Sequence, residues 1–312
     1  ALRLGSDNNF GHDYLKDFEA RFIPRYRCPV STGWREVDDL CRGGHGQGEL
    51  GVVIAPTGAG KSMALVHLGA EALKQGKTVV HYTLELQDTI VASRYDSCLT
   101  GYPLSSLLQY KEEILEMVSD LGGSLIVKEY PTKSATVGVL RNHLSRLINR
   151  GTEIGMVIVD YGDLLRPTRQ RNEKRIELES IYEELRGLAQ EFKCPVWTAS
   201  QTNRSGLNAE VITMEAISEA FNKCFVADLI FSISRTIEDK NTNTGRIYVA
   251  KNRNGPDGLV FPIFMDTSSV KIKVLPPNEE TQNAVYKSTK STMEDLREKY
   301  KTFRTKDKKE SK

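Results

Sequence analysis

Short apolar runs alternate with longer amphipathic stretches along most of this chain. The runs are rich in valine and isoleucine, which favour buried strands, and the stretches between them have the spacing of helices. This alternation is typical of a parallel sheet with helices on both faces, so we expect an α/β fold. The last three runs have no helical pattern between them and predict antiparallel hairpins at one edge. After a first run at Val52, Val53 and Ile54, strands are expected at 78–85, 124–129, 156–160, 195–200, 228–234, 246–251, 259–264 and 271–275, and helices near 89–99, 107–121, 137–149 and 173–192.

The two ends of the chain differ from this pattern, so we divide it into a linker at 1–30, a globular domain at 31–276 and a tail at 277–312. In the linker, four apolar residues recur at helical spacing before Pro24 stops the pattern. One helix cannot bury that stripe alone, so it is expected to dock either on its own domain or on a neighbouring subunit. The stripe consists of Tyr14, Leu15, Phe18 and Phe22.

The tail is polar and rich in lysine, and we expect it to be disordered. Its one amphipathic fragment, "MEDLREKYKTF", leaves a partner-binding helix as the alternative; the apolar side of that fragment holds Met293, Leu296, Tyr300 and Phe303.

Composition narrows the class of protein. With 312 residues and 39% hydrophobic content the chain can bury a full core, and it has no stretch of membrane-spanning length and no signal-peptide pattern. We therefore expect a soluble, cytoplasmic protein without a membrane partner. Five widely spaced cysteines without a CxxC pair favour reduced, mostly buried thiols over disulfides or a zinc site. The first residue is Ala1 and not methionine, as expected of a fragment.

The net charge of +2 hides an uneven distribution. Ten of the 43 basic residues but only five of the 41 acidic ones lie at 287–312, so the tail is basic and the rest is nearly neutral. Any nucleic acid must therefore be held by local loops and not by an overall positive field.

The stretch "GVVIAPTGAGKS" combines a buried strand with a glycine turn and a lysine. Helical spacing resumes behind it, so the order is strand, loop, helix, which is what a phosphate-binding loop requires. Backbone N–H groups and the helix N-terminus would surround a polyphosphate such as ATP, Lys61 would neutralise its outer oxygens and Ser62 would ligate Mg²⁺. The alternative is a flexible turn with a solvated lysine. The expected loop consists of Ala55, which replaces the usual glycine, followed by Pro56, Thr57, Gly58, Ala59, Gly60, Lys61 and Ser62.

Three other strand ends carry polar side chains suited to hydrolysis. Asp160 closes "MVIVD", where a carboxylate can hold Mg²⁺ beside Ser62. Glu85 closes "VVHYTLE" and is a candidate general base, and Gln201 follows "PVWTAS" as a candidate sensor of the γ-phosphate. Each could instead be an ordinary residue at a strand end.

Two cations, Lys251 and Arg253, lie two residues apart in "AKNRNGPDG" and lead into a tight turn. An arginine held by such a turn can reach transition-state charge in another subunit's site. A solvated basic strand end is the competing interpretation.

Taken in order, these segments resemble the C-terminal ATPase domain of the DnaB-type replicative helicases, a group with a RecA-like P-loop core. "STGWREVDDLCRGGHGQGEL" resembles that family's lead-in to its Walker A loop, "TLELQ" its Ser-Leu-Glu-Met box and "VIVDYGDLL" its Walker B motif. "TASQTNR" is similar to its glutamine motif, "KNRNGP" to its arginine-finger motif, and "GHDYLKDFEARF" to the linker helix of T-even phage helicases.

The resemblance, which covers roughly residues 10–275, implies a homohexameric ring that hydrolyses ATP at subunit interfaces and moves 5′ to 3′ on single-stranded DNA. It assigns Lys61, Ser62 and Asp160 to nucleotide and Mg²⁺, Glu85 to the base and Gln201 to the sensor, with Lys251 and Arg253 acting in trans. It also implies that the linker helix docks on the adjacent subunit, and that primase and a helicase loader are partners. The family's N-terminal collar, which contacts primase, is absent from these residues.

A ring that encloses single-stranded DNA needs cations in its lumen that contact successive phosphates along the strand. The cluster "RPTRQRNEKR" directly follows the Walker B strand, and Arg204 follows Gln201. Neither has a stacking aromatic residue, so phosphate tracking is expected, although a solvated loop is the alternative. The family's central DNA loop has a basic residue just before the "ADL" strand, where this chain offers Lys223 only nearby. The cluster supplies Arg166, Arg169, Arg171, Lys174 and Arg175.

Three functions fit these residues. The first is an ATP-driven motor that unwinds duplex DNA, and the second is a RecA-like recombinase or DNA clamp, in which ATP gates filament formation. The third is a packaging or signalling ATPase whose partner is a protein. Steady, DNA-stimulated turnover favours the motor.

Overall fold

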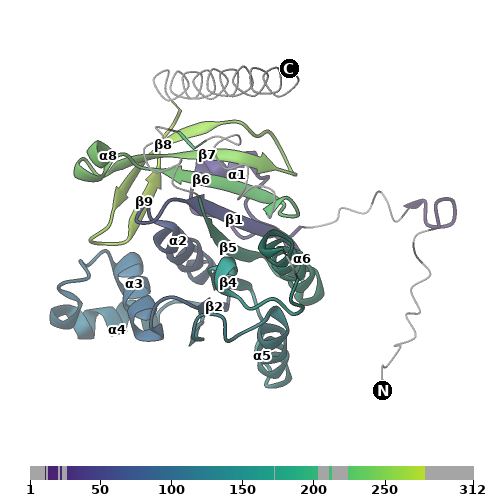
Figure 1. Cartoon of the computed structure of the whole chain (residues 1–312). Coiled ribbons are helices and arrows are strands. Elements are labelled where there is room, and N and C mark those ends of the chain that lie inside the picture. Colours follow the sequence, from purple (N-terminus) through teal and green to yellow (C-terminus); the bar gives the residue numbers. More distant parts are fainter. Residues whose placement is uncertain are drawn as a thin grey trace, which may run out of the picture.

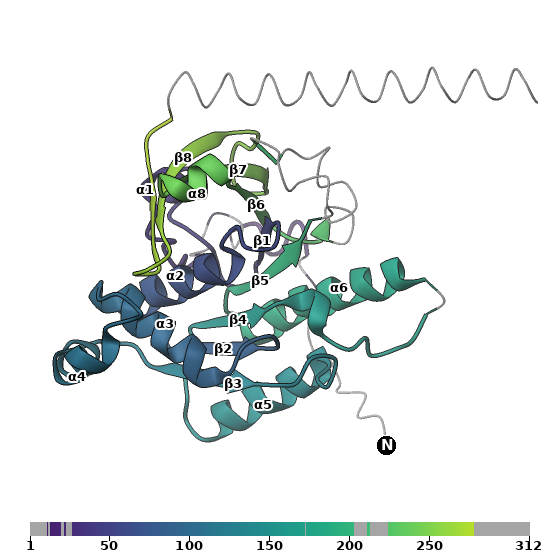
Figure 2. The same ribbon diagram turned by 60° about the vertical axis from the view of Figure 1, so that its left-hand side comes forward.

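The computed structural model describes residues 11, 13–19, 22, 27–171, 173–202, 211, 212 and 224–277. Figures 1 and 2 show a twisted sheet with helices on both of its faces. Nine strands form the sheet in the order β3-β2-β4-β5-β1-β6-β7-β8-β9. Their bounds are β1 Leu50–Ala55, β2 Val79–Thr83, β3 Leu125–Glu129, β4 Met156–Asp160, β5 Val196–Gln201, β6 Leu229–Ser234, β7 Thr244–Asn252, β8 Val260–Asp266 and β9 Lys271–Val274.

The α/β architecture expected from the sequence is confirmed. Strands β1 to β6 pair in parallel, and β6 to β9 pair antiparallel at one edge. Every residue of β1, β2 and β4 is buried, as expected of strands covered on both faces. The helices are α1 Arg35–Leu40, α2 Lys61–Lys74, α3 Asp88–Thr100, α4 Lys111–Ser119, α5 Val137–Asn149, α6 Lys174–Phe192 and α8 Ile237–Asn241, with 3₁₀ turns η2 at Leu107–Tyr110 and η3 at Gly162–Leu164.

Two apolar cores lie on the two faces of the sheet. One gathers side chains of α5 and α6, such as Leu144 and Leu185, against the strands. The other gathers side chains of α1, α2 and α3, such as Val37, Leu65 and Tyr95. In the described residues, no helix has both the length and the apolar content needed to cross a bilayer.

Most element boundaries lie within one or two residues of the sequence-based expectation, and two of the differences have a clear physical reason. The run expected as a strand to residue 85 ends at Thr83, because the Thr83 hydroxyl bonds both the N–H and the carbonyl of Leu86 and bends the chain. The helix expected over 107–121 is divided into η2 and α4. Apolar spacing alone does not separate a 3₁₀ turn from the α-helix that follows it.

The ends of the chain are described only in part. Residues 14–18 form turns, with the Asp13 carboxylate accepting from the N–H groups of Leu15 and Lys16, and the four apolar side chains of the linker stripe are exposed. Docking of this stripe stays a prediction. Residues 278–312, with the amphipathic fragment of the tail, lie outside the described residues. All five cysteines are free thiols, and Cys41, Cys194 and Cys224 are buried.

Candidate functional site

The glycine loop connects the end of β1 to the start of α2 at the carboxyl edge of the parallel strands. Gly60 is the residue before the first turn of α2 and has a φ of 106°, in the left-handed region that favours glycine. A Cβ at Gly60 would also lie 2.8 Å from the sulfur of Met265 in β8. The sequence therefore folds here as the strand, loop and helix that it predicts, with the helix N-terminus facing the loop.

Lys61 lies among three carboxylates. Burial lowers the pKa of the Lys61 ammonium, and the negative charges of Asp160, Glu85 and Asp163 oppose that shift. A half-buried cation on the first turn of a helix is suited to bind an anion, because the charge and the helix dipole act in the same direction.

Asp160 ends β4 beside Ser62 and is only 1% exposed. The Ser62 side chain hydrogen-bonds to this carboxyl group, but the Oδ1 atom of Asp160 has no partner among the described residues. Burial raises the pKa of Asp160 to about 6, against the hydrogen bond from Ser62. A buried, unpartnered carboxylate oxygen is costly unless a ligand satisfies it.

These donors fit Mg²⁺. A hydroxyl and a carboxylate are hard oxygen ligands, and Mg²⁺ sites commonly use one or two such groups together with substrate phosphates. The residues that would hold the cation are Ser62 and Asp160, as the sequence predicts.

Glu85 lies just beyond β2, the neighbour of β4. Thr83 at the end of β2 is in register with Asp160, so Glu85 emerges beside the same edge. Glu85 is exposed, and its charge acts on both Lys61 and Asp160. An exposed carboxylate here is free to contact water near a bound phosphate.

Gln201 connects two parts of the site. Its amide nitrogen donates to the hydroxyl of Thr57 in the glycine loop, and its amide oxygen accepts from the Tyr161 hydroxyl at 3.4 Å. Its backbone N–H lies 3.4 Å from an oxygen of Asp163. A change at the phosphate loop can therefore reach the segment that follows β4 through a single side chain.

Two residues of this arrangement, Tyr161 and Asp163, were not predicted as site residues from the sequence. The Tyr161 ring lies 5.6 Å from the Lys61 ammonium, and Asp163 accepts from the hydroxyls of Tyr182 and Ser200. The only signal in the sequence was their place in the segment "VIVDYGDLL", directly after Asp160.

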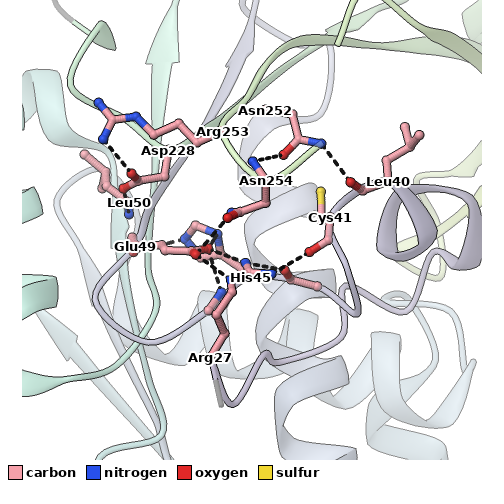
Figure 3. Close-up of polar contacts among 12 residues, drawn as sticks. Arg27, Leu40, Cys41, His45, Glu49, Leu50, Asp228, Asn252, Arg253 and Asn254 are labelled. Carbon is pink, nitrogen blue, oxygen red and sulfur yellow. Dashed lines mark hydrogen bonds and ion pairs between the residues drawn. The ribbon is translucent and has the colours of Figure 1, made fainter. Parts of the chain in front are cut away.

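Lys251 and Arg253, the two cations expected to act in trans, lie instead at the end of the sheet opposite the carboxyl ends of the parallel strands. β7 runs antiparallel to β6, so its last residue, Asn252, pairs with Leu229 where β6 begins. A nitrogen of Arg253 lies 3.1 Å from the carboxylate of Asp228, which in turn accepts from the N–H of Leu50, the first residue of β1 (Figure 3). The structure therefore separates Arg253 from its own phosphate loop by the length of β1. Lys251 donates to the carbonyl of Phe225.

The basic cluster after β4 is exposed and follows the same carboxyl edge as Asp160. Arg166, Arg169 and Arg171 lie on the loop, and Lys174 and Arg175 on the first turn of α6. Arg204 and Lys223 lie outside the described residues.

Comparisons with known proteins identify relatives of this chain. The family model of the DnaB-like helicase C-terminal domain matches residues 29–270. The chain is 28% identical over 269 residues to a DnaB-like replicative helicase of Enterobacteria phage T4, covering 82% of this chain and 57% of that protein. It is 28% identical over 275 residues to the replicative DNA helicase DnaB of Mycoplasma genitalium, covering 81% and 58%. The chain thus spans little more than half the length of these relatives.

Solved structures show the same fold. One solved ATPase domain superposes with a TM-score of 0.68 at 16% identity, covering 83% of this chain and 95% of that one. A DnaB-like replicative helicase, studied for its interactions with primase, superposes with a TM-score of 0.69 at 15% identity, covering 86% and 68%. Since the family model matches residues 29–270, which are most of the chain, this protein belongs to the DnaB-like helicase C-terminal domain family.

Proposed function

We propose that the chain is the ATP-hydrolysing motor of a replicative DNA helicase, which assembles as a homohexameric ring, moves along single-stranded DNA and unwinds duplex. The observation that supports it most is the separation of Arg253 from the phosphate loop. β1 has six residues, which corresponds to roughly 17 Å at the usual rise of a strand. Lys61 and Arg253 of one chain cannot then act on the same phosphate.

A second copy would complete the site. If the edge that carries Arg253 faces the edge that carries the phosphate loop of the next copy, each interface holds one complete site. Such a head-to-tail contact is heterologous and closes into a ring or continues as a filament. An arginine supplied in trans typically contributes a large part of the rate of phosphoryl transfer.

Each residue has a separate task in this proposal. Lys61 neutralises the outer phosphate oxygens, Glu85 accepts the proton of the attacking water, and the neighbour's Arg253 stabilises the charge of the transition state. The Mg²⁺ held by Ser62 and Asp160 would neutralise phosphate charge. Gln201 senses the γ-phosphate through Thr57 and passes the change to Tyr161. Lys251, beside Arg253, adds a second positive charge at the same interface.

The DNA would pass along the carboxyl edge of the sheet. The exposed arginines that follow β4 lie next to the segment that Gln201 contacts, which supports coupling between the phosphate site and the strand. We expect Arg166, Arg169, Arg171 and Lys174 to contact phosphates and not bases. Arg204 is a further proposed contact.

The exposed linker stripe also supports assembly. Its four side chains are unburied in the single chain, as are Leu108 and Leu115 near α4. Apolar surface of this kind favours contact with another protein. We propose that the linker docks on an adjacent copy, and that primase and a helicase loader are further partners of the complete protein.

Mixing two inactive variants tests the shared site. Lys61→Ala should abolish turnover, and Arg253→Ala should retain nucleotide binding without hydrolysis. Mixed rings should recover part of the single-stranded-DNA-stimulated ATPase rate, because some interfaces then pair an intact loop with an intact arginine. Arg141→Gln, which removes only an exposed ion pair with Glu191, is the matched control.

Two results would count against the proposal. The first is the absence of recovery at every mixing ratio, and the second is a solitary chain that hydrolyses ATP at full rate. Particle images of the same samples distinguish closed rings from the filaments of a recombinase or clamp. An ATPase rate indifferent to single-stranded DNA would indicate a protein partner instead.

A further inference from the structure

Asp228 is shared by two arginines at the start of β6. One of its oxygens lies 3.1 Å from a nitrogen of Arg253 (Figure 3) and accepts from Arg186 at 3.2 Å. The other oxygen accepts from Arg186 and from the backbone N–H of Leu50. Its carboxyl group is 7% exposed, whereas the side chain of Arg253 is 43% exposed. The carboxylate is therefore fixed by the sheet, and the guanidinium reaches from it toward solvent.

The turn that carries Arg253 is fixed as well. The backbone N–H of Arg253 donates to the carbonyl of Asp228, and the side chain of Asn252 donates to the carbonyl of Leu40. A Cβ on Gly255 would collide with that same carbonyl oxygen, so only glycine permits this close approach.

A second carboxylate holds the far side of the turn. Asn254 donates to Glu49 at 3.1 Å, and Arg27 donates two hydrogen bonds of 2.8 Å to Glu49 (Figure 3). Arg27 also donates to the carbonyl of Cys41, just after α1. Two acidic side chains, Asp228 and Glu49, thus flank the start of β1 and face the turn from two sides.

We propose that Asp228 is a positioning residue for Arg253, setting the guanidinium in the orientation in which it enters the neighbouring site, while Glu49 fixes the turn through Asn254. This inference rests on the proposed function, because it deepens the role of the trans-acting arginine. One nitrogen of the Arg253 fork lies against Asp228, and two further nitrogens of the planar fork remain to meet a phosphate.

The physical reason is preorganisation. A free arginine side chain loses considerable rotamer entropy when it is fixed in one geometry, and an existing ion pair removes part of that cost before the phosphate arrives. Arg186 contributes to the charge balance at Asp228. When the remaining nitrogens of Arg253 bind a phosphate and share its positive charge, Arg186 and the Leu50 N–H still neutralise and bond Asp228, so the buried carboxylate keeps its partners.

Asp228→Asn tests this with little change of shape, because the amide retains an oxygen that can accept from Leu50. We expect kcat for ATP to fall about 10- to 100-fold, as for a misplaced catalytic group, and less than in Arg253→Ala. KM and the affinity for MgADP should stay within about twofold of the parent, because the loop of the same chain is untouched. Asn254→Ala, which removes only the contact with Glu49, should lower kcat in the same direction, and Arg141→Gln should not.

Mixtures of variants distinguish a positioning role of Asp228 from a general loss of structure. Asp228→Asn mixed with Lys61→Ala should recover turnover, because the second variant brings an intact arginine to the intact loop of the first. Asp228→Asn mixed with Arg253→Ala should not recover. A merely structural defect would not show this difference between partners.

Two outcomes would overturn the inference. In the first, Asp228→Asn retains the parent kcat. In the second, Lys61→Ala restores Arg253→Ala but does not restore Asp228→Asn. If Lys61→Ala and Arg253→Ala fail to restore each other, the shared site itself fails, and this result refutes the proposed function together with the positioning role of Asp228 that rests on it.

Discussion

Asp160→Asn should remove a specific pH dependence from the stability of the ligand-free protein. Asp160 is almost completely buried, and one of its oxygens has no partner among the described residues. Asparagine has nearly the same shape and can still accept the hydrogen bond from Ser62, but it does not titrate. The difference in unfolding free energy between parent and variant therefore isolates the titration of this one carboxyl group.

The sign and size of the effect follow from the pKa of Asp160. Burial raises that pKa from 3.8 to about 6 in the folded protein. The folded state therefore binds the proton more tightly than the unfolded state. The stability that this tighter proton binding contributes is fully present below pH 3.8 and is lost as the pH rises through about 6. Between about pH 5 and about pH 8, the parent should lose about 1.4 kcal/mol of stability relative to Asp160→Asn.

Urea unfolding followed by tryptophan fluorescence measures this difference, because Trp34 and Trp197 are both buried. The hydrogen-bonding cost of the asparagine amide is the same at each pH and cancels from the slope. Saturating Mg²⁺ and ADP should flatten the dependence, because a bound cation keeps the carboxylate ionised. A parent-minus-variant difference that is constant across this pH range without ligand would refute the argument.

Three further predictions concern single features of the site and the core. Gln201→Ala should leave MgADP affinity unchanged but reduce the stimulation of ATPase by single-stranded DNA, since the bridge from Thr57 is lost; unchanged stimulation would contradict this. Replacing Arg169 and Arg171 by glutamine should weaken single-stranded DNA binding for all sequences alike. In fluorescence anisotropy titrations, the slope of log K against log salt concentration should become smaller in magnitude by about 1.4, or about 0.7 for each phosphate contact that is lost. Gly51→Ala should lower the free energy of unfolding by about 1–3 kcal/mol, because its Cβ would overlap the Trp197 ring; an unchanged urea midpoint would contradict this overpacking.

The local chemistry of the phosphate site follows from short stretches of the sequence. Buried valine-rich runs, the glycines that permit a left-handed turn and the helix that follows are all short-range signals, so the loop ending in Lys61 and Ser62 could be read directly. Because parallel strands present their carboxyl ends at one edge, the sequence also predicted that Asp160 and Gln201 would lie beside that loop. Their chemical roles stay predictions.

Which side chains meet across the sheet depends instead on how distant strands pair. Leu50 and Asp228 are 178 residues apart, yet their contact places Arg253 at the edge opposite Lys61. No periodic pattern records such a pairing, because it depends on the order and direction in which distant strands assemble. The same holds for Tyr161, whose place between Lys61 and Gln201 comes from the neighbouring strands β4 and β5. Local sequence thus specifies the parts of the site, and long-range strand pairing decides which parts one chain can bring together.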